Sequence, residues 1–137
     1  MAGWCITGPV LHGRQLGRQL GFPTANIGVP DDCAASDGVY RSRVTVDGVS
    51  YDAMSNLGCN PSVGGGRRHL ETYLFGFEGS LYGRTLHVEL LIKIRDEHTF
   101  PTVEALRHQL EADRAAIEAM IASERSGAAT ERKKERL

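Results

Sequence analysis

The stretch between residues 38 and 97 constrains the fold more than any other part of the chain, because it reads as strands joined by turns. Residues 39–46 and 49–57 are rich in β-prone side chains, and Asp47-Gly48 separates them. Asp-Gly between two such runs is typical of a two-residue hairpin turn, in which both turn residues take positive φ. The sequence therefore predicts a β-hairpin centred on residues 47 and 48.

Two further segments have strand character. Residues 70–77 form one candidate strand. In residues 86–94 apolar side chains alternate with a mostly polar set, which predicts one face on a core and the other towards water. Neighbouring short strands with no helix between them indicate an antiparallel sheet or barrel. Five positions make up the predicted core face of the second segment: Leu86, Val88, Leu90, Ile92 and Ile94.

The two ends of the chain differ from this middle. Residues 3–28 are rich in Gly and basic side chains, so we interpret them as loop-dominated, and any strand at Pro9 is expected to be edge-like or bulged. Residues 102–123 carry apolar side chains at helical spacing, with Thr102 as the predicted N-cap. Residues 124–137 lack an apolar stripe and are expected to be frayed helix or disordered tail. We expect one domain at residues 1–123 and a polar tail at 124–137.

Composition excludes several classes of protein. The chain has 137 residues, which favours one domain, and its 41% apolar and 24% charged content is typical of a soluble globular protein. Its 16 basic and 17 acidic residues leave a net charge of −1. No broad field therefore favours nucleic acid or an anionic membrane as partner. A nucleic-acid-binding barrel is also disfavoured because no strand face is both basic and aromatic.

The cysteines and the N-terminus predict a cytoplasmic location. Cys5, Cys33 and Cys59 are odd in number and widely spaced, so we expect free thiols in a reducing compartment. The first ten residues lack the basic start and apolar run of a signal peptide. No stretch approaches the roughly 20 apolar residues of a membrane span. The five histidines show no metal-ligand spacing, and we assign them no metal.

Two glycine-rich runs could bind phosphate. Gly, Arg and Thr crowd together in residues 8–26, where a flexible loop would let backbone amides approach phosphate oxygens while Arg supplies charge. The Walker pattern is absent. An ordinary surface loop with several turns explains the same composition. Residues 64–68, Gly-Gly-Gly-Arg-Arg, similarly fit either a phosphate-wrapping loop or a mobile loop with solvated charge.

A possible metal pair lies within the first run. Thr24 and Asn26 are two residues apart, so on an extended segment their side chains point the same way. Both carry hard oxygen atoms of the kind that Mg²⁺ accepts in proteins. The alternative is a turn, in which Pro and Asn are common.

Glu71 is a candidate general base. Alternation places it on the same strand face as Tyr73, Phe75 and Phe77. A carboxylate on an aromatic face is poorly solvated, which raises its pKa towards that of a useful base. The alternative is a glutamate at the edge of a sheet that reaches solvent.

Seven short motifs follow one another along the chain. They are Gly8-Pro9-Val10-Leu11-His12-Gly13, residues 17–26, Gly38-Val39-Tyr40, residues 56–61, Leu70-Glu71-Thr72, Leu81-Tyr82-Gly83, and residues 94–97 followed by Phe100. Each alone is weak, but the ordered set is specific, and over about residues 8–113 it resembles the riboflavin kinase family. The resemblance implies a six-stranded antiparallel β-barrel of Greek-key type with a C-terminal α-helix packed outside it.

The resemblance also implies an activity, the transfer of the γ-phosphate of ATP to the 5′-hydroxyl of riboflavin to give FMN and ADP. Mg²⁺ or another divalent cation is implied, with Thr24 and Asn26 as its ligands, and Glu71 corresponds to the catalytic glutamate. Flavin contacts are implied for Glu71, Arg95 and Phe100. Nucleotide contacts are implied for a larger set: Gly8, His12, Gly13, Arg18, Thr24, Asn26, Leu81, Tyr82 and Gly83.

Two alternatives stay open. In many bacteria this module is the C-terminal half of a longer enzyme whose N-terminal half adenylylates FMN to FAD. The chain is then either a stand-alone kinase or the excised kinase half of a bifunctional FAD synthetase, whose adenylyltransferase domain lies in a longer parent chain. The second alternative is a flavin- or nucleotide-binding module without catalysis. The metal pair and the base argue against it, because simple binding needs neither.

Overall fold

The computed structural model describes residues 4–11, 24–59 and 67–135, with side chains described as far as residue 126. The chain divides into two compact units, Met1–Thr99 and Phe100–Leu137. The first contains all the described strands, and the second contains one long helix.

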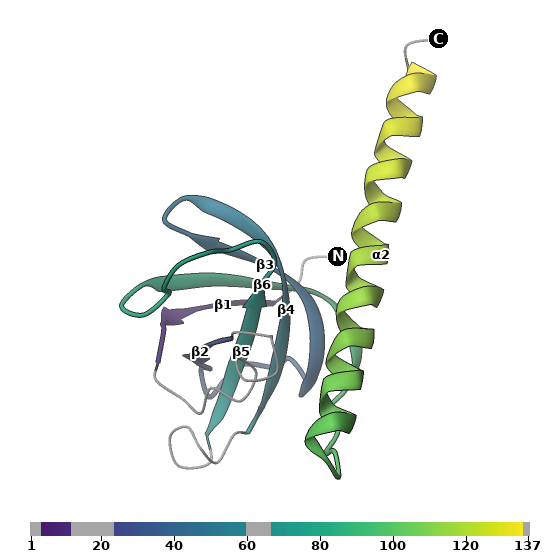
Figure 1. The fold of residues 1–137 in the computed structure, drawn as a ribbon. Helices are drawn as coiled ribbons and strands as arrows, with labels where there is room; N and C mark the ends of the chain where they lie inside the picture. Colours follow the sequence, from purple (N-terminus) through teal and green to yellow (C-terminus); the bar gives the residue numbers. More distant parts are fainter. Residues whose placement is uncertain (1–3, 12–23, 60–66, 136–137) are drawn as a thin grey trace. The chain divides into compact units, whose positions relative to one another are not determined.

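The first unit is a single antiparallel sheet of six strands (Figure 1). Their spatial order is β1-β6-β3-β4-β5-β2. After the run β3-β4-β5, the chain returns to place β6 beside β3, which is the Greek-key arrangement that the resemblance implies. In chain order the strands are β1 (Trp4–Pro9), β2 (Ala25–Gly28), β3 (Gly38–Val46), β4 (Val49–Cys59), β5 (Arg68–Leu74) and β6 (Thr85–Asp96).

The two edge strands, β1 and β2, approach each other and nearly close the sheet into a barrel. The backbone amide of Leu11, just after β1, donates a hydrogen bond of 2.7 Å to the carbonyl of Asn26 in β2. Both strands lie in the region predicted to be loop-dominated, so that prediction is wrong for them. They are short, and their partners β6 and β5 are distant in sequence. Pro9 ends an edge strand, as expected.

The predicted hairpin is confirmed. Val46 pairs with Val49, and the turn residues Asp47 and Gly48 have φ values of 51° and 78°. Both values lie in the left-handed region that a two-residue hairpin turn requires.

The predicted core face of β6 is correct only up to Leu90. Leu86, Val88 and Leu90 are buried, whereas Ile92 is 44% exposed. The pairing of β3 with β6 shifts register at this point, since Ser42 pairs with Leu90 and Arg41 with Ile92. The extra residue, a β-bulge, turns the following side chains to the other face.

The barrel interior is mostly aliphatic, but a chain of three hydroxyl groups crosses it. Ser55 Oγ lies 2.7 Å from Ser42 Oγ and 2.9 Å from Thr72 Oγ1, and all three residues are fully buried. These hydroxyl groups link β3, β4 and β5, and each has a hydrogen-bond partner although it is removed from water. The main apolar members of the core are Ile6, Ile27, Val44, Val46, Leu57, Leu70, Leu74, Leu86, Val88 and Leu90.

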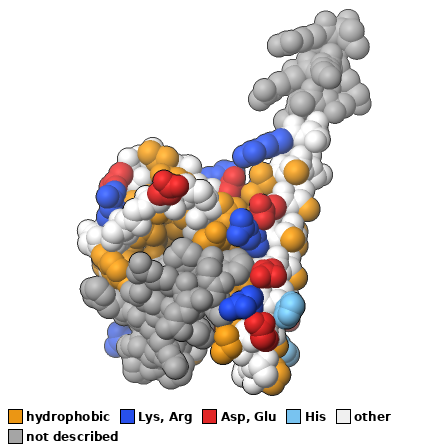
Figure 2. All heavy atoms as spheres, viewed as in Figure 1, with side chains coloured by type: hydrophobic (Ala, Val, Ile, Leu, Met, Phe, Trp, Pro, Cys, Tyr) orange, Lys and Arg blue, Asp and Glu red, His pale blue; other side chains and the backbone are white. Residues whose placement is uncertain are grey.

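The second unit contains helix α2 (Val103–Glu135). Thr102 is its N-cap, because its Oγ1 accepts a hydrogen bond of 3.0 Å from the amide of Ala105. The helix continues through residues 124–135, beyond the predicted end at residue 123. Acidic and basic side chains are interspersed along it (Figure 2), and Arg107 pairs with Glu104 at 2.8 Å. Among the described residues, no helix has the length and apolar content to cross a membrane. The predicted packing of the helix outside the barrel stays a prediction.

Candidate active site

One row of paired residues crosses five strands of the barrel. Asn26 on β2 lies opposite Glu71 on β5, which also lies opposite Asn56 on β4. Asn56 lies opposite Val39 on β3, and Val39 opposite Arg95 on β6. Directly opposed residues of antiparallel strands present their side chains on the same face. The row therefore brings together, on one face of the sheet, three residues that the sequence singled out: Asn26, Glu71 and Arg95.

Glu71 occupies the face of β5 that is turned away from the barrel core. Its neighbours Leu70 and Thr72 are fully buried in the interior, whereas Glu71 is half-buried, as the alternation predicted. The predicted aromatic face is correct only as far as Tyr73, because β5 ends at Leu74 and Phe77 packs against the core. Burial raises the pKa of the Glu71 carboxyl, and the negative charge of Glu97 raises it further. Once ionised, this carboxylate is a stronger proton acceptor than an exposed glutamate.

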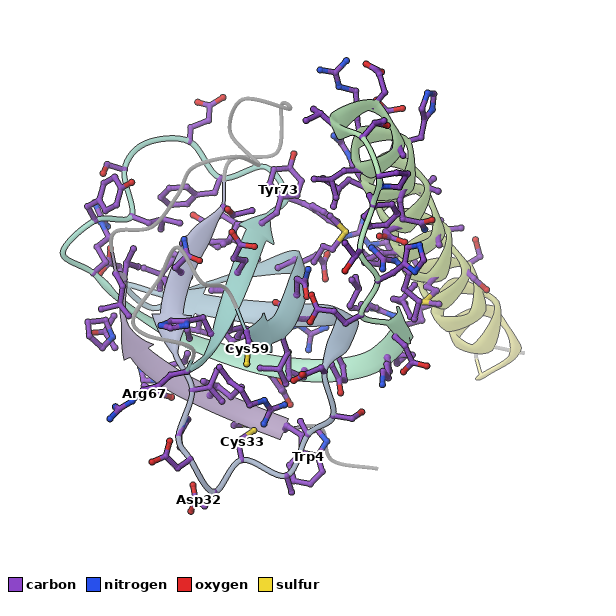
Figure 3. The ribbon with its side chains drawn as sticks, turned by 90° about the horizontal axis from the view of Figure 1, so that it is seen from below. Trp4, Asp32, Cys33, Cys59, Arg67 and Tyr73 are labelled. Carbon is purple, nitrogen blue, oxygen red and sulfur yellow. The ribbon has the colours of Figure 1, made fainter. Side chains whose placement is uncertain are left out.

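Glu71 lines a small cavity of about 30 Å³, called here the acceptor cavity. Cys59 and Tyr73, labelled in Figure 3, lie on β4 and β5, the two strands that carry all the lining residues except Glu97. His69 Nδ1 donates a hydrogen bond of 2.8 Å to the carbonyl of Arg67, which fixes the orientation of the ring. The residues around the cavity are Asn56, Gly58, Cys59, His69, Glu71 and Glu97.

Glu97 carries the second carboxyl of the acceptor cavity. Partial burial raises its pKa, and the charge of Asp37 raises it further, while the guanidinium of Arg95 opposes both effects. Asn56, Gly58 and Glu97 belong to two of the family motifs, but no role was predicted for them. Membership of those motifs, residues 56–61 and 94–97, was the available signal, and all three residues line the same cavity.

Thr24 and Asn26 place two oxygen atoms that lack partners beside this row. Thr24 Oγ1 and Asn26 Oδ1 are buried and have no hydrogen-bond partner within the described part of the chain. A buried polar atom left without a partner costs about 1–3 kcal/mol, so such atoms commonly mark the place of a ligand or ion. Hydroxyl and amide oxygens are hard donors, and this pair fits a divalent cation such as Mg²⁺.

A second, larger cavity of about 560 Å³ adjoins Thr24. This volume lies within the range of roughly 300–1,000 Å³ that is usual for small-molecule sites. The cavity brings together three residues of the implied nucleotide set, Thr24, Leu81 and Tyr82, and Gly83 follows in a turn with a φ of 77°. Its lining consists of Val10, Thr24, Ala25, Leu74 and residues 77–82.

The remaining predicted site residues are less informative. Gly8 lies in β1 opposite Leu86, where an added Cβ would be 3.9 Å from the carbonyl oxygen of Gly28. His12, Gly13 and Arg18 lie outside the described residues. Phe100 belongs to the second unit, and its flavin contact stays a prediction.

Arg68, from the second glycine-rich run, is engaged in the barrel itself. Its guanidinium donates to the carbonyls of Cys33 and Ala35, at 3.0 and 2.5 Å, and pairs with Asp37 at 2.8 Å. These contacts hold the loop before β3 against the start of β5. Arg68 therefore fits neither interpretation of the run, a phosphate ligand or a solvated charge, while residues 64–66 lie outside the described part of the chain.

Fold and site together define a class: a small Greek-key β-barrel that carries a cavity of nucleotide size and, on a strand face, a half-buried carboxyl. The model of the flavokinase, or riboflavin kinase, family matches residues 2–121, which is most of the chain. The chain belongs to the riboflavin kinase family.

Individual relatives agree with this assignment. A bifunctional riboflavin kinase/FMN adenylyltransferase of Pseudomonas fluorescens is 44% identical over 118 residues, which make up 85% of this chain and 38% of the relative. A riboflavin kinase structure from Trypanosoma brucei has a TM-score of 0.66 at 26% identity and covers 89% of this chain and 79% of that one. A structure described as a macrolide-efflux protein from Streptococcus pneumoniae has a TM-score of 0.75 at 35% identity, with coverages of 85% and 38%. The chain thus spans little more than a third of the bifunctional relative.

Proposed function

We propose that the chain is a riboflavin kinase, which transfers the γ-phosphate of ATP to the 5′-hydroxyl of riboflavin and releases FMN and ADP. The observation that carries the proposal is the register row, in which Glu71 lies opposite Asn26 and close to a cavity of nucleotide size that Thr24 lines. Family membership supplies the two substrates. A module that only bound flavin would need neither a basic carboxylate nor a pair of buried oxygen donors.

Glu71 is the proposed general base. Its carboxylate accepts a hydrogen bond from the 5′-hydroxyl and takes its proton as the oxygen attacks the γ-phosphorus. The raised pKa of Glu71 suits this role, because a base whose pKa lies nearer to neutrality accepts a proton more readily in the transition state. Holding hydroxyl and phosphate in line supplies much of the rate enhancement of such transfers.

Thr24 and Asn26 are the proposed ligands of a divalent cation, Mg²⁺ or one like it. Their buried oxygens lack other partners among the described residues, which supports the assignment. When bound, the cation would offset negative charge on the phosphate oxygens.

The large cavity is the proposed ATP site, with Leu81 and Tyr82 along its wall. Its apolar residues exclude water from the phosphates, which limits hydrolysis of ATP. Gly8, His12, Gly13, Arg18 and Gly83 complete the proposed nucleotide set on the basis of the family motifs. Arg95 and Phe100 are the proposed flavin contacts on the basis of the family motifs.

A cytoplasmic location is proposed for the same protein. Cys5, Cys33 and Cys59 are free thiols in the structure, as is usual in a reducing compartment. The name of the Pseudomonas relative also suggests that an adenylyltransferase domain accompanies this module in longer parent chains.

One assay tests the proposal. The protein is incubated with riboflavin, ATP and Mg²⁺, and FMN, FAD and ADP are resolved by chromatography, with a parallel reaction in EDTA. We expect FMN and ADP in equal amounts, and neither product in EDTA. Flavin binding without any FMN would instead support a binding module and contradict the kinase proposal. FAD among the products would reveal an adenylyltransferase activity that the proposal does not include.

A further inference from the structure

The carboxylate of Glu97 occupies the place of a missing side chain at Gly58. An ideal Cβ on Gly58 would overlap Glu97 Oε2, and it would lie 2.7 Å from Cδ and 3.1 Å from Oε1. Gly58 lies within β4, paired with His69, so its backbone is that of a strand. A glycine in a strand interior often marks a close approach of another group. At Gly58 that group is the Glu97 carboxylate.

With the Glu97 carboxylate against Gly58, hydrogen-bond acceptors surround the acceptor cavity. Asn56 is two residues before Gly58 and therefore lies on the same strand face. Its Oδ1 is buried and has no hydrogen-bond partner within the described part of the chain. Glu71 lies directly opposite Asn56. Three side chains from β4, β5 and the segment after β6 thus present acceptor oxygens to one cavity.

The size and chemistry of the cavity select its ligand. Its volume of about 30 Å³ exceeds the roughly 10–15 Å³ that a cavity needs to hold one water molecule, so a hydroxyl group fits. Ionised carboxylates and an amide oxygen only accept hydrogen bonds, so they require donors. A polyol chain, which offers a hydroxyl donor on each of several neighbouring carbons, meets both conditions.

We infer that Asn56 and Glu97 are specificity-determining residues that hold hydroxyl groups of the substrate's polyol chain beside Glu71, and that Gly58 makes room for Glu97. The inference rests on the proposed function, in which the polyol is the ribityl chain of riboflavin. The hydroxyl groups of the ribityl chain are then recognised by β4 and by the segment after β6, and the flavin ring is contacted by other residues.

Binding of two flavins tests the inference. Quenching of flavin fluorescence is titrated with riboflavin and with lumiflavin, which carries a methyl group in place of the ribityl chain. Glu97→Gln keeps the size of the side chain but replaces one acceptor oxygen with a donor. We expect about a tenfold loss of riboflavin affinity, the scale of one hydrogen bond to a charged group, and an unchanged lumiflavin affinity. Glu111→Gln, on the exposed surface of α2, is the matched control.

A double-mutant cycle tests the role of Gly58. The methyl group of Gly58→Ala should displace the Glu97 carboxylate, so this variant should lose riboflavin affinity as Glu97→Ala does. If both act through one carboxylate, the double variant is no weaker than Glu97→Ala alone. Additive losses would overturn the role of Gly58. Thermal unfolding checks each variant, and if Gly58→Ala fails to fold, Glu97→Gln alone decides.

The outcomes separate this inference from the proposed function. Wild-type protein that forms no FMN overturns the proposed function. Wild-type protein that forms FMN, with a Glu97→Gln variant that binds riboflavin normally, overturns only the inference. Equal loss of riboflavin and lumiflavin affinity would also overturn it, as would a changed Mg²⁺ requirement with normal riboflavin binding.

Discussion

Asn26 on β2 stands directly opposite Glu71 on β5, so a half-buried carboxyl shares one face of the barrel with an amide whose oxygen has no hydrogen-bond partner among the described residues. Both residues belong to paired strands, so the hydrogen bonds of the sheet set their separation. A site built on paired strands is positioned more accurately than one built on loops. Substitutions at single positions of this face can therefore test the role of each side chain.

Removing the proposed base should slow phosphate transfer strongly. Glu71→Gln keeps the size of the side chain but cannot accept the proton, and general-base effects amount to roughly 10²–10⁴-fold. We expect a fall in kcat of this size in the FMN assay, with nucleotide affinity retained. A turnover within about tenfold of wild type would show that Glu71 is not the base.

The activity should fall at acidic pH because Glu71 must be ionised to act. Burial and the charge of Glu97 raise the pKa of Glu71, so the acidic limb of kcat/KM for riboflavin should lie above the ordinary glutamate value of about 4.3. Glu97→Gln removes the neighbouring charge and should move this limb to lower pH. An identical acidic limb in wild type and Glu97→Gln would contradict the electrostatic coupling.

The same raised pKa predicts a pH-dependent cost in stability. A carboxyl whose pKa is higher in the folded state contributes stability below its unfolded pKa, and this contribution is lost as pH rises through the folded pKa. Glu71→Gln, which stays neutral, should therefore have a higher Tm than wild type at pH 8. The difference should shrink towards pH 4. A Tm difference that is constant with pH would argue against a buried charge at Glu71.

Loss of a metal ligand should weaken the binding of ATP in the presence of Mg²⁺. Thr24→Ala removes one of the two buried oxygens that have no partner in the part of the chain that the structure describes. We therefore expect weaker binding of ATP in Mg²⁺ but unchanged binding in EDTA, measured by calorimetry. Thr85→Ala, at an exposed position of β6, is the control and should bind as wild type in both conditions. Equal affinities of Thr24→Ala and wild type in Mg²⁺ would remove Thr24 from the site.

The hydroxyl chain inside the barrel should contribute to stability. Ser55→Ala removes the central hydroxyl and leaves those of Ser42 and Thr72 without this partner in a fully buried setting. Leaving buried polar groups unpaired costs about 1–3 kcal/mol, measurable by urea unfolding. Ser50→Ala, which removes an exposed hydrogen bond to Thr45, should cost less than about 0.5 kcal/mol. Equal losses in the two variants would contradict the importance of the buried chain.

Local patterns were enough to predict several elements. The Asp47-Gly48 turn, the alternation of residues 70–74 and the Thr102 cap each depend on residues within a few positions of one another, and the structure confirms all three. Short edge strands carry no such local signal. β1 and β2 were missed because their hydrogen-bond partners are remote in sequence.

Other features could be decided only by the tertiary structure. The bulge that turns Ile92 outward arises from pairing with β3, and no pattern within β6 encodes it. Gly38 and Gly58 read as ordinary motif glycines, yet a Cβ on Gly38 would lie 2.5 Å from the carbonyl oxygen of Arg95, and one on Gly58 would overlap Glu97. The need for glycine at Gly38 arises from the backbone of β6, and the free space at Gly58 is filled by a side chain from the segment after β6.

By itself the sequence determined the strands between residues 38 and 97, the family and the residues with suitable chemistry, because these depend on residue type and local order. It did not determine which of those residues meet. Asn26, Glu71, Asn56 and Arg95 form one row only because four strand pairings have a particular register. Register reflects the packing of all the strands together, since a slip of one residue would turn every side chain of a strand to the opposite face.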